Sequence, residues 1–292
     1  MIEFYQLEQL LTIAREGTLS KAAEVLLISQ PALTRSMQRL EEELGIKLFN
    51  RKKNKIELNQ NGKLAVELFE KLLNEKEQII STLQAYNRSQ FEINIGSCAP
   101  APIWGLKHVL TKQYPDMQIH DVLDSHEDVL LNGLKNYEFS IIVLNHPIDD
   151  SHYECVKLFE ENLFLSVPPA HPLALFKDIS FDDLNGESVL LLSRIGFWNE
   201  ICQKVIPQSH LLFQEDGQVF NELIKASALP NFRSDITMLT DEREKENRVA
   251  IPIINDEAHV TYYAIYDKNN KKLFAFLQEA MKNINWKEVT HD

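Results

Sequence analysis

The stretch Ser29-Gln30-Pro31-Ala32-Leu33-Thr34-Arg35-Ser36-Met37-Gln38-Arg39-Leu40-Glu41-Glu42-Glu43-Leu44-Gly45 carries the signals of one complete helix. A serine such as Ser29 can cap the start, because its hydroxyl accepts a hydrogen bond from a backbone N–H that lacks a helical partner. Pro31 fits the first turn, where its missing N–H costs nothing, and Gly45 suits the left-handed residue that ends many helices. Apolar residues recur at spacings of four, three and four and form one face: Leu33, Met37, Leu40 and Leu44.

The opposite face of this stretch offers hydrogen-bond donors and acceptors, with no carboxylate before Glu41: Gln30, Thr34, Arg35, Gln38 and Arg39. Such a face can lie in the major groove of DNA, where side chains near the helix N-terminus reach the base edges. An ordinary amphipathic surface helix would show the same pattern. The stretch by itself therefore leaves both interpretations open.

The flanking sequence predicts a winged helix-turn-helix. Residues 3–15 keep a helical apolar period, and Thr18 or Ser20 can cap a short second helix that contains Ala22 and Ala23. Three short helices with this spacing make a helix-turn-helix. After Gly45, residues 46–49 are strand-like, 50–55 form a basic turn and 56–58 return as a second strand. The cations of this wing would meet phosphates or the minor groove.

Residues 1–62 resemble the DNA-binding domain of LysR-type transcriptional regulators. The resemblance is carried by four motifs in order: Ala22-Ala23, Ser29-Gln30-Pro31-Ala32, the run Leu40-Glu41-Glu42-Glu43-Leu44-Gly45-Ile46-Lys47-Leu48-Phe49-Asn50-Arg51, and Leu58-Asn59-Gln60-Asn61-Gly62. The one departure is Asn59, where the family usually has threonine, and asparagine caps helices equally well. The resemblance implies an all-α winged helix-turn-helix domain over 1–58 that binds double-stranded DNA.

We expect the first turns of the central helix to contact bases or sugar edges, through Gln30, Pro31, Thr34 and Arg35. We expect phosphate contacts from Ser20, Lys21, Arg39, Arg51 and Lys53. Ser29 and Ala32 complete the predicted DNA-binding set. The acidic end, 41–43, is expected to face solvent or the wing.

Residues 59–89 contain no proline and keep helical spacing through six apolar positions: Leu64, Leu68, Leu72, Ile79, Leu83 and Tyr86. About 30 helical residues extend about 45 Å. A helix of that length needs a partner for its apolar stripe, so we predict that it pairs with a second copy of the chain. The alternative is a helix packed on its own domain. In the family resembled, this linker helix forms the dimer contact, which implies a homodimer or a homotetramer.

The remaining residues, 90–292, alternate predicted strands and helices. Strands are expected at 91–96, 117–123 and 139–144, with helices at 103–114 and 127–134 between them, an order that predicts a parallel α/β sheet. A second set follows, with strands at 163–167 and 189–192, a helix at 197–205, a strand at 260–266 and a terminal helix at 272–284.

This part resembles the LysR-type effector domain, a two-lobed α/β fold like that of periplasmic binding proteins. The matching segments are Ile95-Gly96, Tyr114-Pro115, 163–174 and Asp183-Leu184. We expect lobe one at about 90–161 plus 266–292 and lobe two at about 162–265. The family usually has a Gly-x-Gly-Ile-like turn late in lobe two, and residues 225–236 depart from it.

Ligands of open α/β sheets bind beyond the C-terminal ends of strands and against helix N-termini. Applied to the predicted strands, this rule selects a candidate effector-binding set: Ser97, Cys98, Ser125, Asn145, Ser193, Arg194 and Phe197. Backbone N–H groups, hydroxyls and one arginine suit a small carboxylate or another anion. Each of these residues could instead serve as a helix cap or a loop contact.

The charge of the chain is uneven. The net charge is −13, yet residues 28–55 hold seven basic and three acidic side chains, which fits a local DNA contact on an acidic body. No signal peptide or membrane span is predicted, and the three cysteines are far apart in sequence, as in reduced proteins. These features lead us to expect a cytoplasmic protein.

Enzymatic signals are absent from the sequence. It has no zinc-protease helix pair, Cys-x-x-Cys, nucleophile elbow or glycine-rich phosphate loop, so we expect no enzyme, cofactor or metal. A redox role for Cys98, whose pKa a helix N-terminus would lower, is an alternative. A solute-binding module or enzyme with a vestigial DNA domain, and a hydrolase using Ser97 or Cys98, are others. We predict an effector-modulated, sequence-specific transcriptional regulator.

Overall fold

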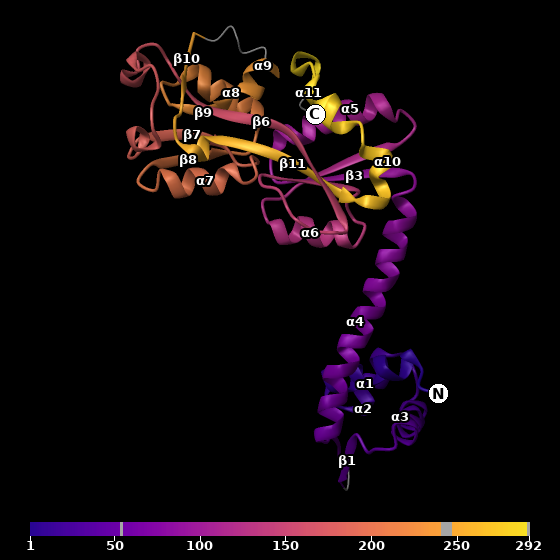
Figure 1. The fold of residues 1–292 in the computed structure, drawn as a ribbon. Coiled ribbons are helices and arrows are strands. Elements are labelled where there is room, and N and C mark those ends of the chain that lie inside the picture. Colours follow the sequence, from indigo (N-terminus) through magenta and orange to yellow (C-terminus); the bar gives the residue numbers. More distant parts are fainter. Residues whose placement is uncertain (53–54, 241–246, 291–292) are drawn as a thin grey trace. The chain divides into compact units, whose positions relative to one another are not determined.

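The computed structural model describes residues 1–52, 55–240 and 247–290, without the side chains of 51, 52, 55, 56 and 240 (Figure 1). The chain divides into two compact units, Met1–Gln84 and Ala85–Asp292. The first unit is mostly helical and the second is an α/β unit.

The first unit contains three short helices, a two-stranded hairpin and most of a long helix: α1 (Phe4–Glu16), α2 (Leu19–Val25), α3 (Gln30–Leu44), β1 (Phe49–Lys52), β2 (Lys55–Leu58) and α4 (Gln60–Arg88). The predicted caps of α3 are present: the Ser29 hydroxyl accepts from the backbone N–H of Ala32, and Gly45 has a φ of 72°. Thr18 rather than Ser20 caps α2.

The apolar face of α3 forms the core of this unit. Leu33, Met37 and Leu40 are at most 3% exposed and belong to a cluster that includes residues of α1 and α2. Ala22 and Ala23 are also buried, and their small side chains let the helices approach closely. The prediction of a helix-turn-helix is confirmed.

The wing begins later than predicted. The sequence favoured a strand from residue 46, but β1 starts at Phe49 and pairs antiparallel with β2. The reason is Glu41, which is 3% exposed: its carboxylate accepts from the backbone N–H groups of Leu48 (2.8 Å) and Phe49 (3.2 Å). A helix carboxylate therefore takes the hydrogen bonds that a longer strand would have made, and this end of α3 faces the wing.

The second unit is built on one mixed sheet in the order β4-β3-β5-β11-β6-β9-β7-β8, with β10 paired to β6. Its strands are β3 (Glu92–Ser97), β4 (Gln118–Leu123), β5 (Ile141–Leu144), β6 (Tyr153–Val167), β7 (Ser188–Leu192), β8 (His210–Gln214), β9 (Asn231–Ser234), β10 (Val249–Pro252) and β11 (His259–Asp267). Its α-helices after α4 are α5 (Pro100–Gln113), α6 (Glu127–Lys135), α7 (Trp198–Val205), α8 (Gly217–Ala226), α9 (Asp235–Thr240), α10 (Lys271–Phe274) and α11 (Leu277–Lys282).

Two lobes share this sheet. We call lobe one the part on the parallel strands β3, β4 and β5, and lobe two the part on β7, β8 and β9. The long strands β6 and β11 pair antiparallel from Tyr153↔Asp267 to Asn162↔His259 and run through both lobes. The lobe boundaries predicted near 161 and 265 fall inside these two strands.

Two sequence expectations for this unit need correction. The terminal helix predicted at 272–284 is two short helices, α10 and α11, although Ala275 and Phe276 between them keep right-handed helical dihedral angles. No elements were predicted between residues 206 and 259, where the structure has β8, α8, β9, α9 and β10. These elements are four to ten residues long.

Candidate functional sites

The N-terminal turn of α3 gathers several of the predicted DNA-binding side chains. Ser20 donates from its hydroxyl to the Gln30 side-chain oxygen at 3.2 Å, and the Thr34 hydroxyl donates to the Gln30 carbonyl at 2.9 Å. Ser29 caps the same turn. The first turn of α2, which contains Ser20, and the first turn of α3 thus form one polar surface, and hydrogen bonds hold its side chains in place.

Exposed cations flank this surface. Lys21, Arg35 and Arg39 are exposed, and Arg35 and Arg39 lie four residues apart on one helix face. Among the described residues, neither arginine has an ion-pair partner. Pro31 is exposed and Ala32 half-buried beside them. Uncompensated charge on an exposed helix face is what phosphate binding requires.

The wing carries the other two predicted phosphate contacts. Arg51 belongs to β1, opposite Ile56, but its side chain lies outside the described part of the chain. Lys53 lies outside the described residues altogether. Of these two contacts, the structure therefore places only the backbone of Arg51.

A backbone hydrogen bond joins the two lobes of the second unit. The N–H of Phe197, at the start of α7, donates to the carbonyl of Cys98, at the end of β3, at 2.9 Å. The neighbouring Gly196 has a φ of 61°, and a Cβ there would collide with the same Cys98 carbonyl oxygen. Only glycine allows this close approach. We call the contact the Cys98–Phe197 bridge.

A polar cavity of about 310 Å³ lies against the bridge. Four residues of the predicted effector set line it: Cys98, Ser125, Asn145 and Phe197. The other lining residues are Glu127, Leu144, His146, Glu200, Ile201 and Lys204. The ring Nε2 of His146 lies 3.1 Å from the Glu127 carboxylate. Side chains that follow three different strands of lobe one thus meet α7 of lobe two here.

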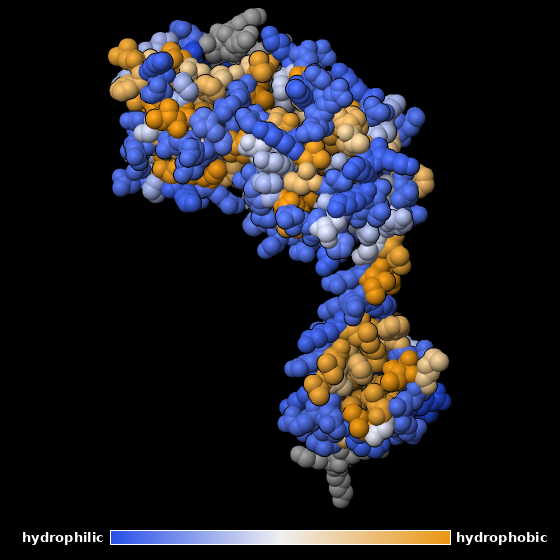
Figure 2. Space-filling model, viewed as in Figure 1, coloured by the Kyte–Doolittle hydropathy of each residue, from blue (hydrophilic) through white to orange (hydrophobic). Residues whose placement is uncertain are grey.

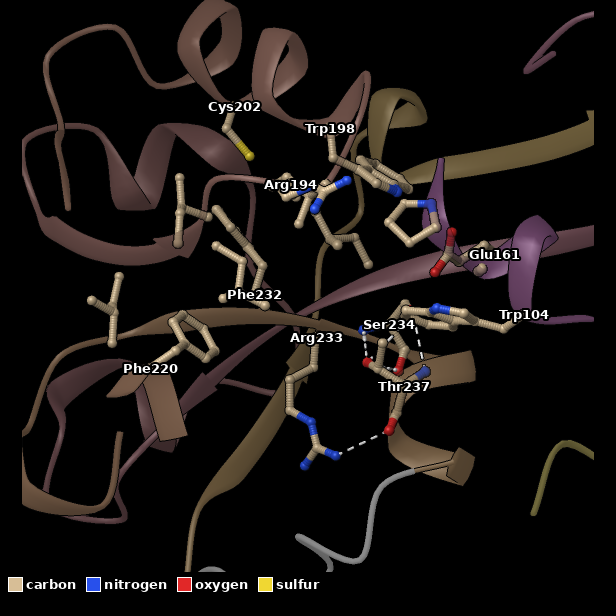
Figure 3. A pocket seen from close by; sticks show the side chains of 17 residues that line it. Trp104, Glu161, Arg194, Trp198, Cys202, Phe220, Phe232, Arg233, Ser234 and Thr237 are labelled. Atoms are coloured by element: carbon tan, nitrogen blue, oxygen red, sulfur yellow. Dashed lines mark hydrogen bonds between the residues drawn. The ribbon is translucent and has the colours of Figure 1, made fainter. Parts of the chain in front are cut away.

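A second cavity, of about 140 Å³, is mostly apolar (Figure 3). Arg194 is the one predicted residue that lines it. Most of its wall comes from α5, β6, β7, α7 and β9, through Trp104, Leu163, Leu191, Trp198 and Phe232 among others. One buried carboxyl, Glu161 of β6, belongs to this wall. The two cavities share no lining residue.

Ser97 and Ser193 line neither cavity. Ser97 is fully buried, and its hydroxyl donates to the Ala99 carbonyl at 2.7 Å. Ser193 donates to the Gln214 carbonyl at 3.2 Å, and its own carbonyl accepts from the Asn199 amide at 2.6 Å. Both serines therefore stabilise the backbone next to cavity-lining residues, Ser97 beside Cys98 and Ser193 beside Arg194.

Cys98 does not have the activated thiol that the redox alternative requires. Its side chain is 3% exposed, and burial raises the pKa of the thiol to about 12. Burial therefore argues against the redox alternative, because the loss of solvation raises the pKa more than other interactions lower it.

Glu161 is the polar residue that sequence reasoning missed. It lies at the predicted lobe boundary, in a run of polar residues, 160–162. The available signal was strand alternation, since Glu161, Leu163 and Leu165 point to one face of β6 and all three are buried.

The described residues contain neither a metal-binding cluster nor a membrane span. Within 1–52, 55–240 and 247–290, no group of three or more His, Cys, Asp or Glu side chains is placed to hold a metal ion. None of the helices in that part of the chain has the length and hydropathy of a membrane span.

Comparison with known proteins identifies the family. Residues 4–63 match the model of the bacterial regulatory helix-turn-helix proteins of the lysR family, and residues 100–214 match the LysR substrate binding domain. A probable RuBisCO transcriptional regulator of Phaeodactylum tricornutum is 32% identical over 70% of this chain and 69% of its own length. This chain belongs to the LysR family.

Two other proteins are similar over more of the chain. The uncharacterised HTH-type transcriptional regulator YybE of Bacillus subtilis is 28% identical over 86% of this chain and 89% of its own length. Full-length OxyR of Pseudomonas aeruginosa has a TM-score of 0.54 at 19% identity and matches 100% of this chain and 99% of its own, which shows a shared fold.

These comparisons confirm the predicted fold class and the predicted function. The LysR-family chain is a DNA-binding transcriptional regulator with a helix-turn-helix domain and an effector-binding substrate domain. It is a regulator and not an enzyme.

Proposed function

We propose that α3 enters the major groove and that its first turns read the operator. Gln30, Pro31, Thr34 and Arg35 contact bases or sugar edges in this proposal, with Ser29 and Ala32 in the same turn. Ser20, Lys21, Arg39, Arg51 and Lys53 contact phosphates. The supporting observation is the exposed polar surface at the start of α3, flanked by Lys21, Arg35 and Arg39.

The long helix α4 supports pairing with a second copy. It has 29 residues, and its apolar stripe is 43–64% exposed at Leu64, Leu68, Leu72, Ile79 and Leu83. Figure 2 shows apolar residues gathered along α4. A stripe of this period on an exposed helix is typical of a helix that pairs with another helix. A homodimer, or a homotetramer built from it, would present two recognition helices to the two halves of an operator.

The inter-lobe junction is the proposed effector site. The observation that carries this proposal is the Cys98–Phe197 bridge together with two cavities that are each lined by residues from both lobes. A ligand there contacts both lobes at once, so its binding free energy depends on how the lobes sit around the bridge. A change in lobe arrangement would then alter the dimer and the spacing of its recognition helices. The regulator acts on DNA and is proposed to work in the cytoplasm.

DNA binding tests the first part of the proposal. Operator sequences selected from a random pool by the full-length chain would be titrated by fluorescence anisotropy. Removing a base-reading side chain costs about 1–3 kcal/mol, so Arg35→Ala should weaken binding about tenfold and relax sequence preference at one position.

Arg15→Ala is the matched control, because Arg15 is an exposed arginine at the end of α1 and should leave the affinity unchanged. Equal affinity and preference of Arg35→Ala and the wild type would overturn the groove assignment. The effector proposal fails separately, if no small metabolite in a thermal-shift screen of the full chain both stabilises it and changes its affinity for DNA.

A further inference from the structure

Glu161 is a buried carboxyl that belongs neither to the proposed DNA-binding residues nor to the Cys98–Phe197 bridge. Its side chain is 3% exposed and forms part of the wall of the apolar cavity. Its neighbour Glu160 points the other way on β6, is 60% exposed and pairs with Lys157 at 2.5 Å. A buried carboxyl is costly unless it is paired, so Glu161 needs an explanation that Glu160 does not.

The partners of Glu161 are uncharged. The hydroxyl of Tyr262, on β11, donates to its Oε2 at 2.6 Å, and Ser234 and Trp198 are further hydrogen-bonding neighbours. Among the described residues, no lysine, arginine or histidine pairs with it. The charged neighbour is another carboxylate, Asp235, and burial together with that neighbour raises the pKa of Glu161. The cavity wall therefore contains a carboxyl that lacks a counter-ion.

The rest of the cavity is suited to an apolar body and to a cation. Four aromatic residues line it: Trp104, Trp198, Phe220 and Phe232 (Figure 3). The faces of aromatic rings attract ammonium groups, and tryptophan does so most strongly. The volume of about 140 Å³ is close to that of an engineered cavity of about 150 Å³ that binds benzene. One ring with a short substituent is the expected size of the ligand.

The two arginines of the lining do not supply the missing counter-ion. Arg233 donates from Nη2 to the Thr237 carbonyl at 3.3 Å, and Figure 3 shows its side chain extending away from Glu161. Arg194 is exposed, so water and salt screen its charge. Of the two arginines, Arg233 therefore extends away from Glu161, and Arg194 is exposed to solvent.

We propose that the apolar cavity binds a small organic amine in its ammonium form, with the ammonium on Glu161 and the apolar body among the aromatic rings. This inference rests on the proposed effector site and names the class of its ligand. The ammonium provides the counter-ion that Glu161 lacks, and a buried pair with good geometry keeps both groups charged. A carboxylate ligand would meet Glu161 as a like charge. The proposed ligand is thus a cation, whereas the strand-end residues alone predict an anion.

Three probes of nearly equal size test the class by calorimetry on the full-length chain: 2-phenylethylamine, 2-phenylethanol and phenylacetate. The amine is expected to bind about tenfold more tightly than the alcohol, and phenylacetate more weakly than both. Trp104 and Trp198 line the cavity, so a change in tryptophan fluorescence should accompany binding of the amine.

Glu161→Gln keeps the shape of the side chain and removes its charge. It should weaken the amine about tenfold and leave the alcohol nearly unchanged. Glu160→Gln is the matched control on the adjacent, exposed residue and should bind the amine like the wild type. A thermal unfolding transition like that of the wild type in both variants would show that they fold.

Three results would overturn the amine proposal: preferential binding of phenylacetate, equal loss of amine binding in both variants, or no binding of the amine at up to roughly 10 mM. None of these results bears on whether the junction regulates DNA binding. That question is decided by whether a bound ligand of any class changes the affinity of the chain for its operator.

Discussion

Glu41 and Glu161 are both 3% exposed, yet their surroundings shift their pKa values in opposite directions. Burial raises the pKa of each. For Glu41, hydrogen bonds from the Leu48 and Phe49 N–H groups and the nearby Lys47 ammonium outweigh burial and lower the pKa. For Glu161, burial prevails and the pKa is raised. Glu41 is paired with the N–H groups of the wing and with Lys47. Among the described residues, Glu161 has neutral hydrogen-bond donors, and the proposed ammonium ligand would be its counter-ion.

The largest effect is expected for Glu41→Ala. Removing this acceptor leaves the N–H groups of Leu48 and Phe49 without their partner, and a buried donor without an acceptor costs about 1–3 kcal/mol. We expect α3 and the wing to lose about 3 kcal/mol of stability, measured by hydrogen exchange of their backbone amides.

The matched control is Glu42→Ala, since Glu42 is exposed on the same helix and should change stability by less than about 0.5 kcal/mol. Equal exchange rates in the two variants would show that the Glu41 hydrogen bonds do not fix the wing.

Tyr262→Phe should have the next largest effect, in the second unit. It removes the donor to Glu161, and loss of a buried hydrogen bond to a charged or polar group costs about 1–3 kcal/mol. All three tryptophans of the chain, Trp104, Trp198 and Trp286, lie in this unit. Thermal unfolding followed by tryptophan fluorescence therefore reports on it selectively. Tyr263→Phe is the control, because among the described residues its hydroxyl has no hydrogen-bond partner. The assignment fails if the two variants unfold alike.

The opposite directions of the two pKa values predict opposite pH dependence. The raised pKa of Glu161 means that its full contribution to stability is present below its unfolded pKa of about 4.5 and is lost as the pH rises through the folded pKa. Glu161→Gln should therefore gain stability relative to the wild type as the pH rises from about 5 to 8. The gain should be at most about 1.4 kcal/mol per pH unit, because a single carboxyl releases one proton.

Glu41 has the reverse sign. Its lowered pKa stabilises the folded chain above the unfolded pKa of about 4.5, and that stability is lost as the pH falls through the folded value. The deficit of Glu41→Gln should shrink towards pH 4. The opposite pKa shifts would be contradicted if the stabilities of Glu41→Gln and Glu161→Gln, each relative to the wild type, changed with pH in the same direction.

The smallest effect is expected for Lys47→Met. The ammonium of Lys47 lies 3.1 Å from Glu41 but is 70% exposed, and exposed ion pairs contribute about 0–1 kcal/mol. A loss below about 0.5 kcal/mol in the exchange experiment would show that the backbone N–H groups, and not the ion pair, hold Glu41. A loss as large as that of Glu41→Ala would reverse this ranking.

The sequence predicted best where the signals are local. The extent of α3 follows from Ser29, Pro31, its apolar spacing and Gly45, which all lie within 17 residues. The start of α4 is similar, since Asn59 accepts from the Gly62 N–H at 2.9 Å. The apolar stripes of α3 and α4 look alike in sequence, but one is buried in its own unit and the other is exposed. The spacing of apolar residues identifies the apolar face of a helix but does not show what packs against that face.

The residues of the proposed effector site were selected in part from the sequence. Cys98, Ser125 and Asn145 follow predicted strands, so the strand-end rule selected them, and they line one cavity. Glu161 lies inside a strand, and its partner Tyr262 is 101 residues away. The bridge likewise depends on a contact between Cys98 and Phe197 that no local pattern contains. When the partners of a side chain are distant in sequence, its role can be identified only from the folded structure.

The strand order also has a consequence for synthesis of the chain. Strand β11 fills the position between β5 and β6, yet it is made after the other described strands of the sheet, as residues 259–267. Until it leaves the ribosome, β5 and β6 keep open edges that other chains can pair with. The first unit, in contrast, is complete after residue 84. A nascent chain stalled before residue 259 would thus carry a complete first unit together with open strand edges at β5 and β6.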